Sequence, residues 1–563
     1  MKKIDLHCVP QDVAVKSFFL GPSAENREWI TSQVTYILNS WFDWRKNFSG
    51  GEGCLISDSD KAVSEFKTQQ KWSEDVIASL VKRFESEIPK FSPRYIGHMF
   101  SEISMPALLG HIITLLHNPN NISSEASTVG TEIEKEAIYF LSELAGYRQG
   151  TGHFTSGGTV ANFEFLFRAR ERLFNWLNAA AAAGEKDLFA ASIMGWSKYN
   201  AIVDSLGQDK IKKVHPTKAP VLLVSSSKHY SWPKGMHYLG LGEENLIYVD
   251  LDQSGRMSVV DLYEKLKFLQ QENTPLLGVV GIAGTTELGT IDPISEIADV
   301  LKKFTCGKDG HIWFHIDAAY GGFFRSLVKA ESAANLDTAT FKNLLSMSEA
   351  DSVTLDPHKL GYVPYASGAF ICKNSEDYFI KPFTGPYIKS DRHNLGNFTI
   401  EGSRSAAGAV ATYTSMKCFQ GSDGYARILA RTMLAKDIFK KALQKNEMKI
   451  LFPGGQDTNI LCFSVVAGFK NLSQVNSLNL RIYERIAEEN KYWISKTTLT
   501  KHHFNLMIHN SCMKECLALD SEEMVLLRLT LMNPFIISKE SPVDHATRFA
   551  ELINHVAYDL NHK

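Results

Sequence analysis

Three short segments carry side chains whose types and spacing suit chemistry. The first, Thr155-Ser-Gly-Gly-Thr-Val-Ala-Asn162, has small residues at a predicted helix start, where backbone N–H groups and hydroxyls can bind one phosphate. The second, His315-Ile-Asp-Ala-Ala-Tyr320, places Asp317 at the end of an apolar strand, where ligands of α/β sheets gather. The third, Asp356-Pro-His-Lys359, places a lysine just past another apolar strand. A desolvated lysine in such a crevice is a nucleophile that traps carbonyl compounds.

Each segment also has an ordinary structural explanation. A Gly-Gly turn often only punctuates a helix, a lone aspartate at a strand end is often a helix cap, and a lysine is more often a surface residue. His229, which follows another short strand, is a single histidine of a kind that usually has a structural role. When these segments are considered together and in their order along the chain, a functional site is favoured over the separate structural explanations. A phosphate loop, then a histidine, an aspartate and a lysine are what a pyridoxal phosphate site needs.

The four groups would have distinct roles in such a site. Lys359 would hold the cofactor as a Schiff base, Asp317 would keep the pyridine nitrogen protonated, and an aromatic residue such as His229 would stack on the ring. At about 3 Å and an effective dielectric constant near 20, the attraction between a carboxylate and a pyridinium is on the order of 5 kcal/mol. That attraction would keep a weakly basic nitrogen charged at neutral pH.

Two other kinds of site are not expected. The segment Gly150-Thr-Gly152-His-Phe-Thr155 begins like a dinucleotide fingerprint but lacks the third glycine, so we reject a nicotinamide site. His311, His315 and Asp317 share one face of a predicted strand, but at about 3.3 Å per residue they spread over roughly 20 Å. That is too far to chelate one ion, so no metal site is predicted.

The elements that must position these groups follow from apolar periodicity. From residue 219, short apolar strands alternate with helical segments, which predicts a mainly parallel α/β sheet. The strands expected are 221–224, 246–249, 277–282, 312–316 and 353–355, and helices are expected at 25–47, 60–88, 104–117, 130–146, 159–178, 258–271 and 293–304. Beyond residue 405, helices 405–419, 424–445, 474–494 and 543–558 with strands 448–452, 459–465 and 524–532 predict a smaller α+β domain.

We therefore divide the 563 residues into an N-terminal helical segment (1–103), a large cofactor-binding domain (104–420) and a small C-terminal α+β domain (421–563). The 60 basic and 62 acidic side chains give a net charge of −2, with no basic excess that would favour nucleic acid. No run reaches the roughly 18 apolar residues of a membrane-spanning helix.

The start of the chain favours a cytoplasmic protein. Asp5, His7 and Asp12 interrupt what would have to be an apolar signal core of roughly 7–15 residues. The eight cysteines are scattered over a long chain, which is typical of reduced thiols in the cytosol.

The sequence resembles the pyridoxal-phosphate-dependent group II decarboxylases, a fold-type-I family that includes aromatic amino acid, glutamate, histidine and tyrosine decarboxylases. The resemblance covers most of residues 90–420 and rests on Ser92-Pro-Arg-Tyr-Ile-Gly-His-Met99, Thr155–Asn162, His229-Tyr-Ser-Trp232, Gly284-Thr-Thr286, His315–Tyr320 and Asp356–Lys359. The tyrosine decarboxylases of bacteria look most similar, through Asn118-Pro-Asn-Asn121, Glu125-Ala-Ser127, Tyr362-Val-Pro-Tyr365 and Ile400-Glu-Gly-Ser403. Leu360 departs from the pattern, because the family usually has an aromatic residue after the lysine.

The resemblance implies a role for each matching residue. Beyond Lys359, Asp317 and His229, it implies phosphate contacts from Gly158, Thr159 and His358, a contact of Thr286 with the O3′ atom of the cofactor, and packing of Ala319 on the second ring face. It also implies a homodimer with active sites between subunits. The N-terminal helices carry Trp29, Trp41 and Phe42, more apolar surface than a short segment can bury by itself, and exchange around a partner would cover it.

We expect decarboxylation of an L-amino acid, aromatic and such as tyrosine, to its amine and carbon dioxide. The carbanion that remains needs a proton donor, for which Tyr365 is the first candidate and Tyr387, in a polar segment between glycines, the second. His98 is a candidate substrate contact.

Three alternatives stay open. A glutamate or aspartate decarboxylase is the nearest in substrate and should need a basic side-chain pocket. A transaminase or another carbon–carbon lyase would use the same cofactor groups. A non-catalytic cofactor-binding protein belongs to a different class, with little reason to keep Lys359, Asp317 and His229 together.

Overall fold

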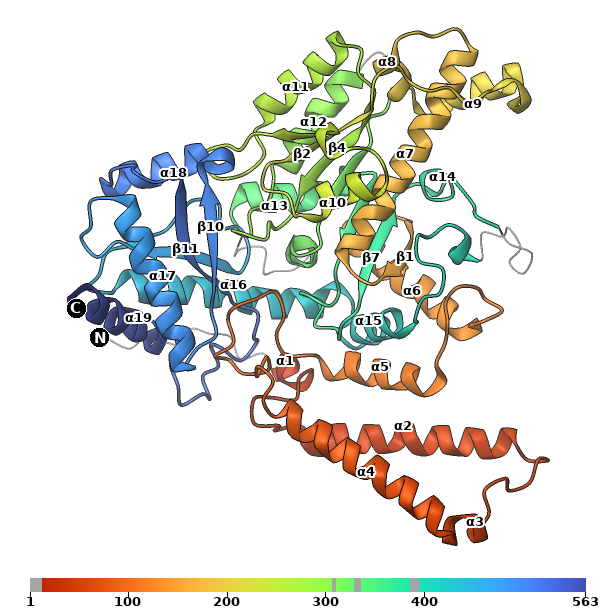
Figure 1. The fold of residues 1–563 in the computed structure, drawn as a ribbon, viewed down its shortest axis with the longest axis vertical. Helices are drawn as coiled ribbons and strands as arrows, with labels where there is room; N and C mark the ends of the chain where they lie inside the picture. The colour runs from red at the N-terminus through yellow and green to blue at the C-terminus, as the bar shows by residue number, and fades with distance from the viewer. Residues whose placement is uncertain (1–12, 306–309, 329–335, 385–393, 563) are drawn as a thin grey trace.

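A seven-stranded sheet forms the centre of the computed structural model, which describes residues 13–305, 310–328, 336–384 and 394–562 (Figure 1). Its strand order is β1 (Thr151–Thr155), β7 (Gly368–Cys372), β6 (Ser352–Leu355), β5 (Phe314–Asp317), β4 (Leu276–Ile282), β2 (Val221–Ser225) and β3 (Leu246–Val249). The pairings among β2 to β6 are all parallel, whereas β7 runs antiparallel to both of its neighbours. The mainly parallel sheet expected from the sequence is confirmed.

Helices cover both faces of this sheet, so its strands are apolar on both sides. In β2, Leu222 and Val224 belong to one core cluster, and Leu223 belongs to the other, because side chains alternate along a strand. The first cluster includes α7 (Gly158–Ala182) and α10 (Ser231–Tyr238). The second includes α6 (Thr128–Ala145), α11 (Val259–Gln271), α12 (Ile294–Thr305), α13 (Thr338–Leu345) and α15 (Ala407–Cys418).

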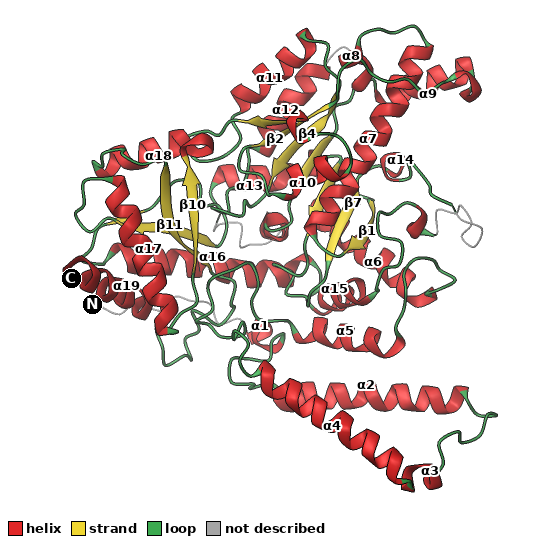
Figure 2. Ribbon diagram, viewed as in Figure 1, coloured by secondary structure: helices red, strands yellow, loops and turns green. Residues whose placement is uncertain are grey.

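A smaller antiparallel sheet lies beside the large one, in the order β10-β11-β9-β8 (Figure 2). Its strands are β8 (Ile450–Leu451), β9 (Ile460–Val465), β10 (Ser495–Thr500) and β11 (Glu523–Thr530), and its helices are α16 (Ser422–Gln444), α17 (Leu472–Glu489), α18 (Lys501–Glu515) and α19 (His545–His562). The helix expected at 474–494 ends earlier, because Asn490 takes a left-handed conformation (φ 50°) that terminates it. The strand β10 and the helix α18 were not expected.

We propose to keep the division of the chain after residues 103 and 420. The first boundary precedes α5 (Met105–His117), and the second precedes α16, the long helix that enters the small domain. The remaining short helices within the large domain are α8 (Leu188–Ser192), α9 (Gly195–Leu206) and α14 (Ser375–Tyr378). None of the helices in the described ranges is long and apolar enough to cross a membrane.

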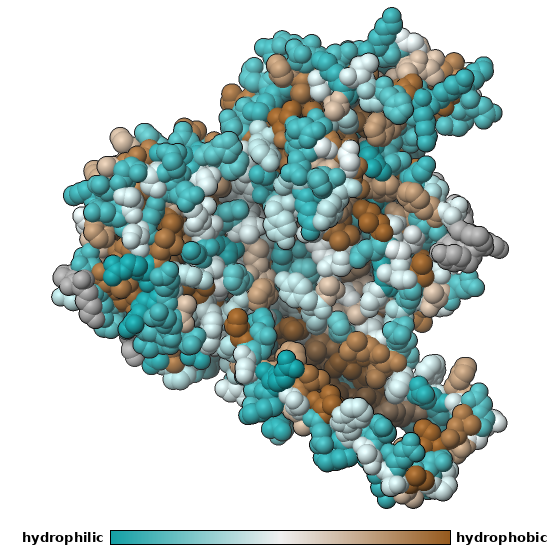
Figure 3. Space-filling view, in the orientation of Figure 1, coloured by the Kyte–Doolittle hydropathy of each residue, from teal (hydrophilic) through white to brown (hydrophobic). Residues whose placement is uncertain are grey.

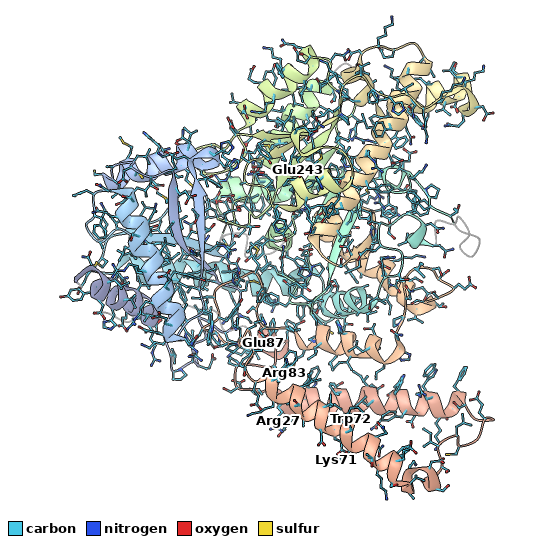
Figure 4. All side chains as sticks on the ribbon, in the orientation of Figure 1. Arg27, Lys71, Trp72, Arg83, Glu87 and Glu243 are labelled. Carbon is cyan, nitrogen blue, oxygen red and sulfur yellow. The ribbon has the colours of Figure 1, made fainter. Side chains whose placement is uncertain are left out.

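Near the start of the described chain, after the short helix α1 (Val13–Ser17), a helical hairpin projects from the body (Figure 1). It comprises α2 (Arg27–Phe48), α3 (Asp58–Ala62) and α4 (Ser64–Phe84), none of which has a buried side chain. The helix expected at 60–88 is interrupted at Val63, whose backbone is extended (ψ 140°). Trp72 and Lys71 are two of the side chains that α4 presents on this hairpin (Figure 4).

Candidate active site

A cavity of about 280 Å³ lies where the carboxyl ends of four parallel strands meet the start of α7. Its walls come from the segments that directly follow β2, β4, β5 and β6, the edge at which α/β sheets bind ligands. The cavity brings together eight residues that the sequence singled out: Gly158, Thr159, His229, Thr286, Asp317, Ala319, His358 and Lys359.

Asp317 ends β5 and is held in place by two hydrogen bonds to one of its oxygens. The side-chain amide of Asn162 and the indole N–H of Trp232 donate to its Oδ2 atom, at 2.9 and 3.1 Å. Asn162 is positioned in turn by the Thr354 hydroxyl, which donates to its Oδ1 atom at 2.8 Å. The carboxylate, 6% exposed, therefore keeps one orientation toward the cavity.

Lys359, just past β6, makes a short ion pair. Its Nζ atom lies 3.0 Å from Oδ2 of Asp356, and Nε2 of His358 lies 3.5 Å from the same oxygen. The backbone N–H of Ser367 donates to Nδ1 of His358 at 3.1 Å, which leaves Nε2 to carry a proton toward Asp356. Burial alone would raise the pKa of Asp356, but Lys359 and His358 outweigh it and lower that pKa. Asp356 was not singled out from the sequence, although it stands in the same motif.

His229 follows β2 and lines the same cavity. The backbone N–H of Ser231 donates to its Nδ1 atom at 3.2 Å, and the Ser231 hydroxyl lies 3.0 Å from that atom. Burial lowers the pKa of His229, and the nearby charge of Lys359 lowers it further, against the carboxylates of Asp317 and Asp356. A neutral imidazole with a fixed edge is suited to lie flat against an aromatic ring.

The start of α7 is shaped for a group that approaches the backbone closely. Gly157 has a φ of 151°, and a Cβ atom at Gly158 would lie 2.8 Å from Oδ2 of Asp356 and 3.1 Å from the Cβ atom of Ala319. Within the described residues, the amides of Gly158 and Thr159 have no hydrogen-bond partner. Two free N–H groups at the positive end of a long helix suit a phosphate.

The histidines that could suggest a metal have other partners. His315 lies 2.8 Å from the Ser352 hydroxyl through Nδ1, and His311 pairs with Asp351 at 3.0 Å. Since β5 begins only at Phe314, His311 precedes the strand instead of sharing its face with Asp317. The described part of the chain contains no group of three or more metal-ligating side chains.

The chain is similar to known proteins along most of its length. It is 27% identical to an L-tyrosine decarboxylase of Enterococcus faecium, covering 93% of this chain and 96% of that protein. It is 30% identical to an aspartate 1-decarboxylase of Aliivibrio fischeri, covering 63% and 61%. The crystal structure of mouse CSAD superposes with a TM-score of 0.62 at 21% identity, covering 84% of this chain and 85% of that one. A family model described as the pyridoxal-dependent decarboxylase conserved domain matches residues 197–466.

The chain belongs to the pyridoxal-dependent decarboxylase family. It is an amino acid decarboxylase of the fold-type-I class, and pyridoxal 5′-phosphate is its cofactor. The cavity fits this cofactor, because free amides suit the phosphate at one end and a fixed carboxylate, a neutral imidazole and a lysine suit the ring and its aldehyde.

The other residues of the decarboxylase that the sequence singled out do not line this cavity in the described part of the chain. Tyr365 stacks on His358 with ring centroids 4.1 Å apart and lines a neighbouring cavity of about 200 Å³. His98 lines neither cavity, and its exposed ring lies 6.0 Å from that of Phe100, which lines the second. Tyr387 lies outside the described residues.

The structure of the decarboxylase adds Arg528, which sequence reasoning missed. This side chain, 5% exposed on β11, donates through Nε to the carbonyl of Glu287 at 3.2 Å and through Nη1 to that of Gly97 at 3.1 Å. Its Nη2 atom is buried without a partner among the described residues. Glu287 directly follows the cavity residue Thr286, so Arg528 is hydrogen-bonded to the segment that lines the site. A lone arginine in the apolar run Glu523–Thr530 was the available signal.

Proposed function

We propose that this decarboxylase acts on an aromatic L-amino acid, with L-tyrosine as the first candidate. The observation that carries the proposal is the second cavity, which shares Lys359 and His358 with the cofactor cavity. Its walls include Phe100, Tyr362 and Tyr365, side chains that pack well against a ring. The similarity to an L-tyrosine decarboxylase over almost the whole chain supports the same choice.

The residues of the first cavity divide the work of holding and orienting the cofactor. Pyridoxal phosphate, when bound, supplies an electron sink for the bond that breaks at the substrate Cα atom. We assign the phosphate to the amides of Gly158 and Thr159 and to His358, and the covalent attachment to the amine of Lys359. Thr286 is assigned to the ring hydroxyl and Ala319 to one ring face.

Asp317 and His229 set the electronic state of the site in this proposal. Because Asn162 and Trp232 both donate to Oδ2 of Asp317, its carboxylate is fixed and can hold a proton at the ring nitrogen. His229, kept neutral by burial, covers the second face of the ring without adding a competing positive charge.

Tyr365 is our candidate for returning a proton to the Cα atom. Its side chain is 56% exposed, but the protein around the hydroxyl and the nearby Asp356 carboxylate raise its pKa to about 12. The hydroxyl therefore stays protonated at neutral pH and can donate. Arg528, with a buried N–H that lacks a partner, is our candidate for binding the substrate carboxylate.

We also propose that the active form is a homodimer in which one copy's hairpin covers the other copy. The hairpin exposes Trp72, Ile77 and Val81, and α5 exposes Leu108 and Leu115. Figure 3 shows hydrophobic side chains gathered where α5 borders the hairpin. Exchange of hairpins around a twofold axis would bury both apolar surfaces at once, which no single copy can do.

Aspartate is the second candidate substrate, favoured by the similarity to an aspartate 1-decarboxylase. A second carboxylate on the substrate would need a free cation in the side-chain cavity. Lys90 lines that cavity, but its ammonium pairs with Glu87 at 3.0 Å. The geometry therefore favours a ring over an acidic side chain.

A panel of L-amino acids tests the proposed substrate. The holoenzyme should release carbon dioxide and the matching amine fastest from tyrosine, compared with phenylalanine, dihydroxyphenylalanine, aspartate and glutamate. A higher kcat/KM for aspartate or glutamate than for every aromatic substrate would contradict the proposal. A keto acid in place of carbon dioxide would instead indicate transamination.

A further inference from the structure

Two of the residues that line the second cavity carry a buried polar atom without a hydrogen-bond partner among the described residues. Glu102 is 8% exposed, and its Oε2 atom is buried without a partner among the described residues. The hydroxyl of Ser101, the preceding residue, is in the same condition, and both residues line the cavity. Leaving a buried polar group unpaired is unfavourable, so natural proteins keep such groups mainly where a ligand or a water molecule completes their hydrogen bonds.

The carboxyl group of Glu102 is not committed to a cation. The two lysines that line the cavity pair elsewhere, Lys359 with Asp356 at 3.0 Å and Lys90 with Glu87 at 3.0 Å. No ion pair to Glu102 is found within the described ranges. Burial raises its pKa to about 7, against a backbone hydrogen bond from Ile103 that lowers it, and the neighbouring charge of Glu25 adds to the effect of burial.

The backbone fixes Glu102 relative to the lysine. Ser104, two residues later, donates its backbone N–H to the carbonyl of Tyr362 at 2.9 Å, which ties this segment to the turn after Lys359. The Ser104 hydroxyl also lies 2.9 Å from that of Ser415 and accepts from Ala107 at the start of α5. These hydrogen bonds hold the segment of Glu102 in a fixed position, and a specific contact with a substrate requires such a position.

We infer that Glu102 determines specificity by accepting a hydrogen bond from a phenolic hydroxyl on the substrate side chain. This inference rests on the proposed function. Because Lys359 and His358 line both cavities, a substrate whose amino group reacts at the cofactor can extend its ring into the second cavity toward Glu102. The rings of Phe100 and Tyr365, in edge-to-face contact with centroids 6.2 Å apart, would form one wall beside it. In this contact the neutral phenolic hydroxyl donates a hydrogen bond to the unpartnered Oε2 atom of Glu102.

The same contact explains the rejection of other side chains. Phenylalanine would leave the Glu102 acceptor buried and unpaired, and sites built around a substrate hydroxyl discriminate strongly against analogues that lack it. Aspartate or glutamate would bring a carboxylate into a cavity whose two lysines already pair with Asp356 and Glu87, and burying a charge without a partner is unfavourable. The cavity thus combines attraction for one side chain with exclusion of the others.

Binding of product amines to the holoenzyme tests the inference without requiring turnover. We expect wild-type protein to bind tyramine about 10–100-fold more tightly than 2-phenylethylamine in calorimetric titrations. Glu102→Leu should reduce this preference to less than threefold, whereas Glu102→Gln, which keeps an acceptor, should retain most of it. Glu85→Leu removes an exposed carboxylate at the end of α4, outside the second cavity, and should leave the preference unchanged.

Two results would overturn the assignment of Glu102. One is a preference for tyramine that survives in Glu102→Leu with full cofactor occupancy, and the other is no preference in the wild type. If Glu102→Leu does not fold, Glu102→Asp, which withdraws the carboxyl group by one methylene, should lose the preference instead. A Glu102-dependent preference in an enzyme that does not decarboxylate tyrosine would refute the proposed substrate and leave this inference standing.

Discussion

The Nζ atom of Lys359 lies 3.0 Å from Oδ2 of Asp356, a carboxylate three residues earlier in the chain and 2% exposed. The turn after β6 brings the two groups together at the carboxyl end of the strand. The pair holds the lysine amine within the cavity, close to the free amides of Gly158 and Thr159. The amine is thereby placed where a cofactor bound by its phosphate would present its aldehyde.

Lys359→Ala should abolish covalent attachment of the cofactor and nearly all turnover, because no other amine lines the first cavity in the described ranges. Borohydride reduction followed by peptide mapping should find the pyridoxyl group on the Lys359 peptide of the wild type. Lys373→Ala, a change at an exposed lysine beyond β7, should behave like the wild type. A pyridoxyl group on a different lysine would contradict the assignment.

Asp317→Asn should fold and bind cofactor but lose activity by about 100-fold or more, since an amide cannot stabilise a charged ring nitrogen. Asn162 and Trp232 both donate to Oδ2, so the amide oxygen would take that position, and the NH2 group would replace Oδ1, which now accepts from the backbone N–H of Ala319 at 3.3 Å. Cofactor occupancy and turnover should be measured on the same sample. Near-normal turnover at full occupancy would remove Asp317 from its proposed role.

Tyr365→Phe keeps the ring that stacks on His358 and removes only the hydroxyl. Cofactor binding should be retained while turnover falls, because a positioned general acid is worth roughly 10²–10⁴-fold. Product analysis should also reveal some diversion from the amine. Tyr199→Phe, in α9, is a matched control far from the site. Wild-type rates and products in Tyr365→Phe would make Tyr387 the leading candidate.

Ile77→Asp together with Val81→Asp should convert the dimer to a monomer. Both side chains are exposed on α4 in the single copy, at 60% and 61%, so the fold of the monomer should survive their replacement. Light scattering coupled to size-exclusion chromatography measures the mass, and circular dichroism checks the fold. Lys67→Asp introduces the same residue on the same helix but at an exposed charged position, where it reverses the sign of the charge, and it should leave the dimer intact. A wild-type protein that is monomeric throughout would refute the proposed assembly.

The sequence alone determined the layered architecture and most of the chemistry-bearing groups. Apolar periodicity is local, so the strand at 221–224 and the helix at 159–178 were predicted close to where β2 and α7 lie. The order of a small-residue loop, His229, Asp317 and Lys359 indicated the cofactor, because these groups are defined by type and by position after a strand. None of this required knowledge of long-range contacts.

Only the tertiary structure decided how distant segments meet. β7 pairs with β1 across more than 200 residues and lies between β1 and β6 in the sheet. The residues of these short strands do not indicate which strand pairs with which. The structure likewise places Arg528 of the small domain near Thr286 and brings Glu102 to the cavity behind Lys359. A buried polar side chain indicates a binding site only when it lacks a hydrogen-bond partner. Whether a partner is present depends on the packing of segments far apart in the chain, which the sequence alone does not show.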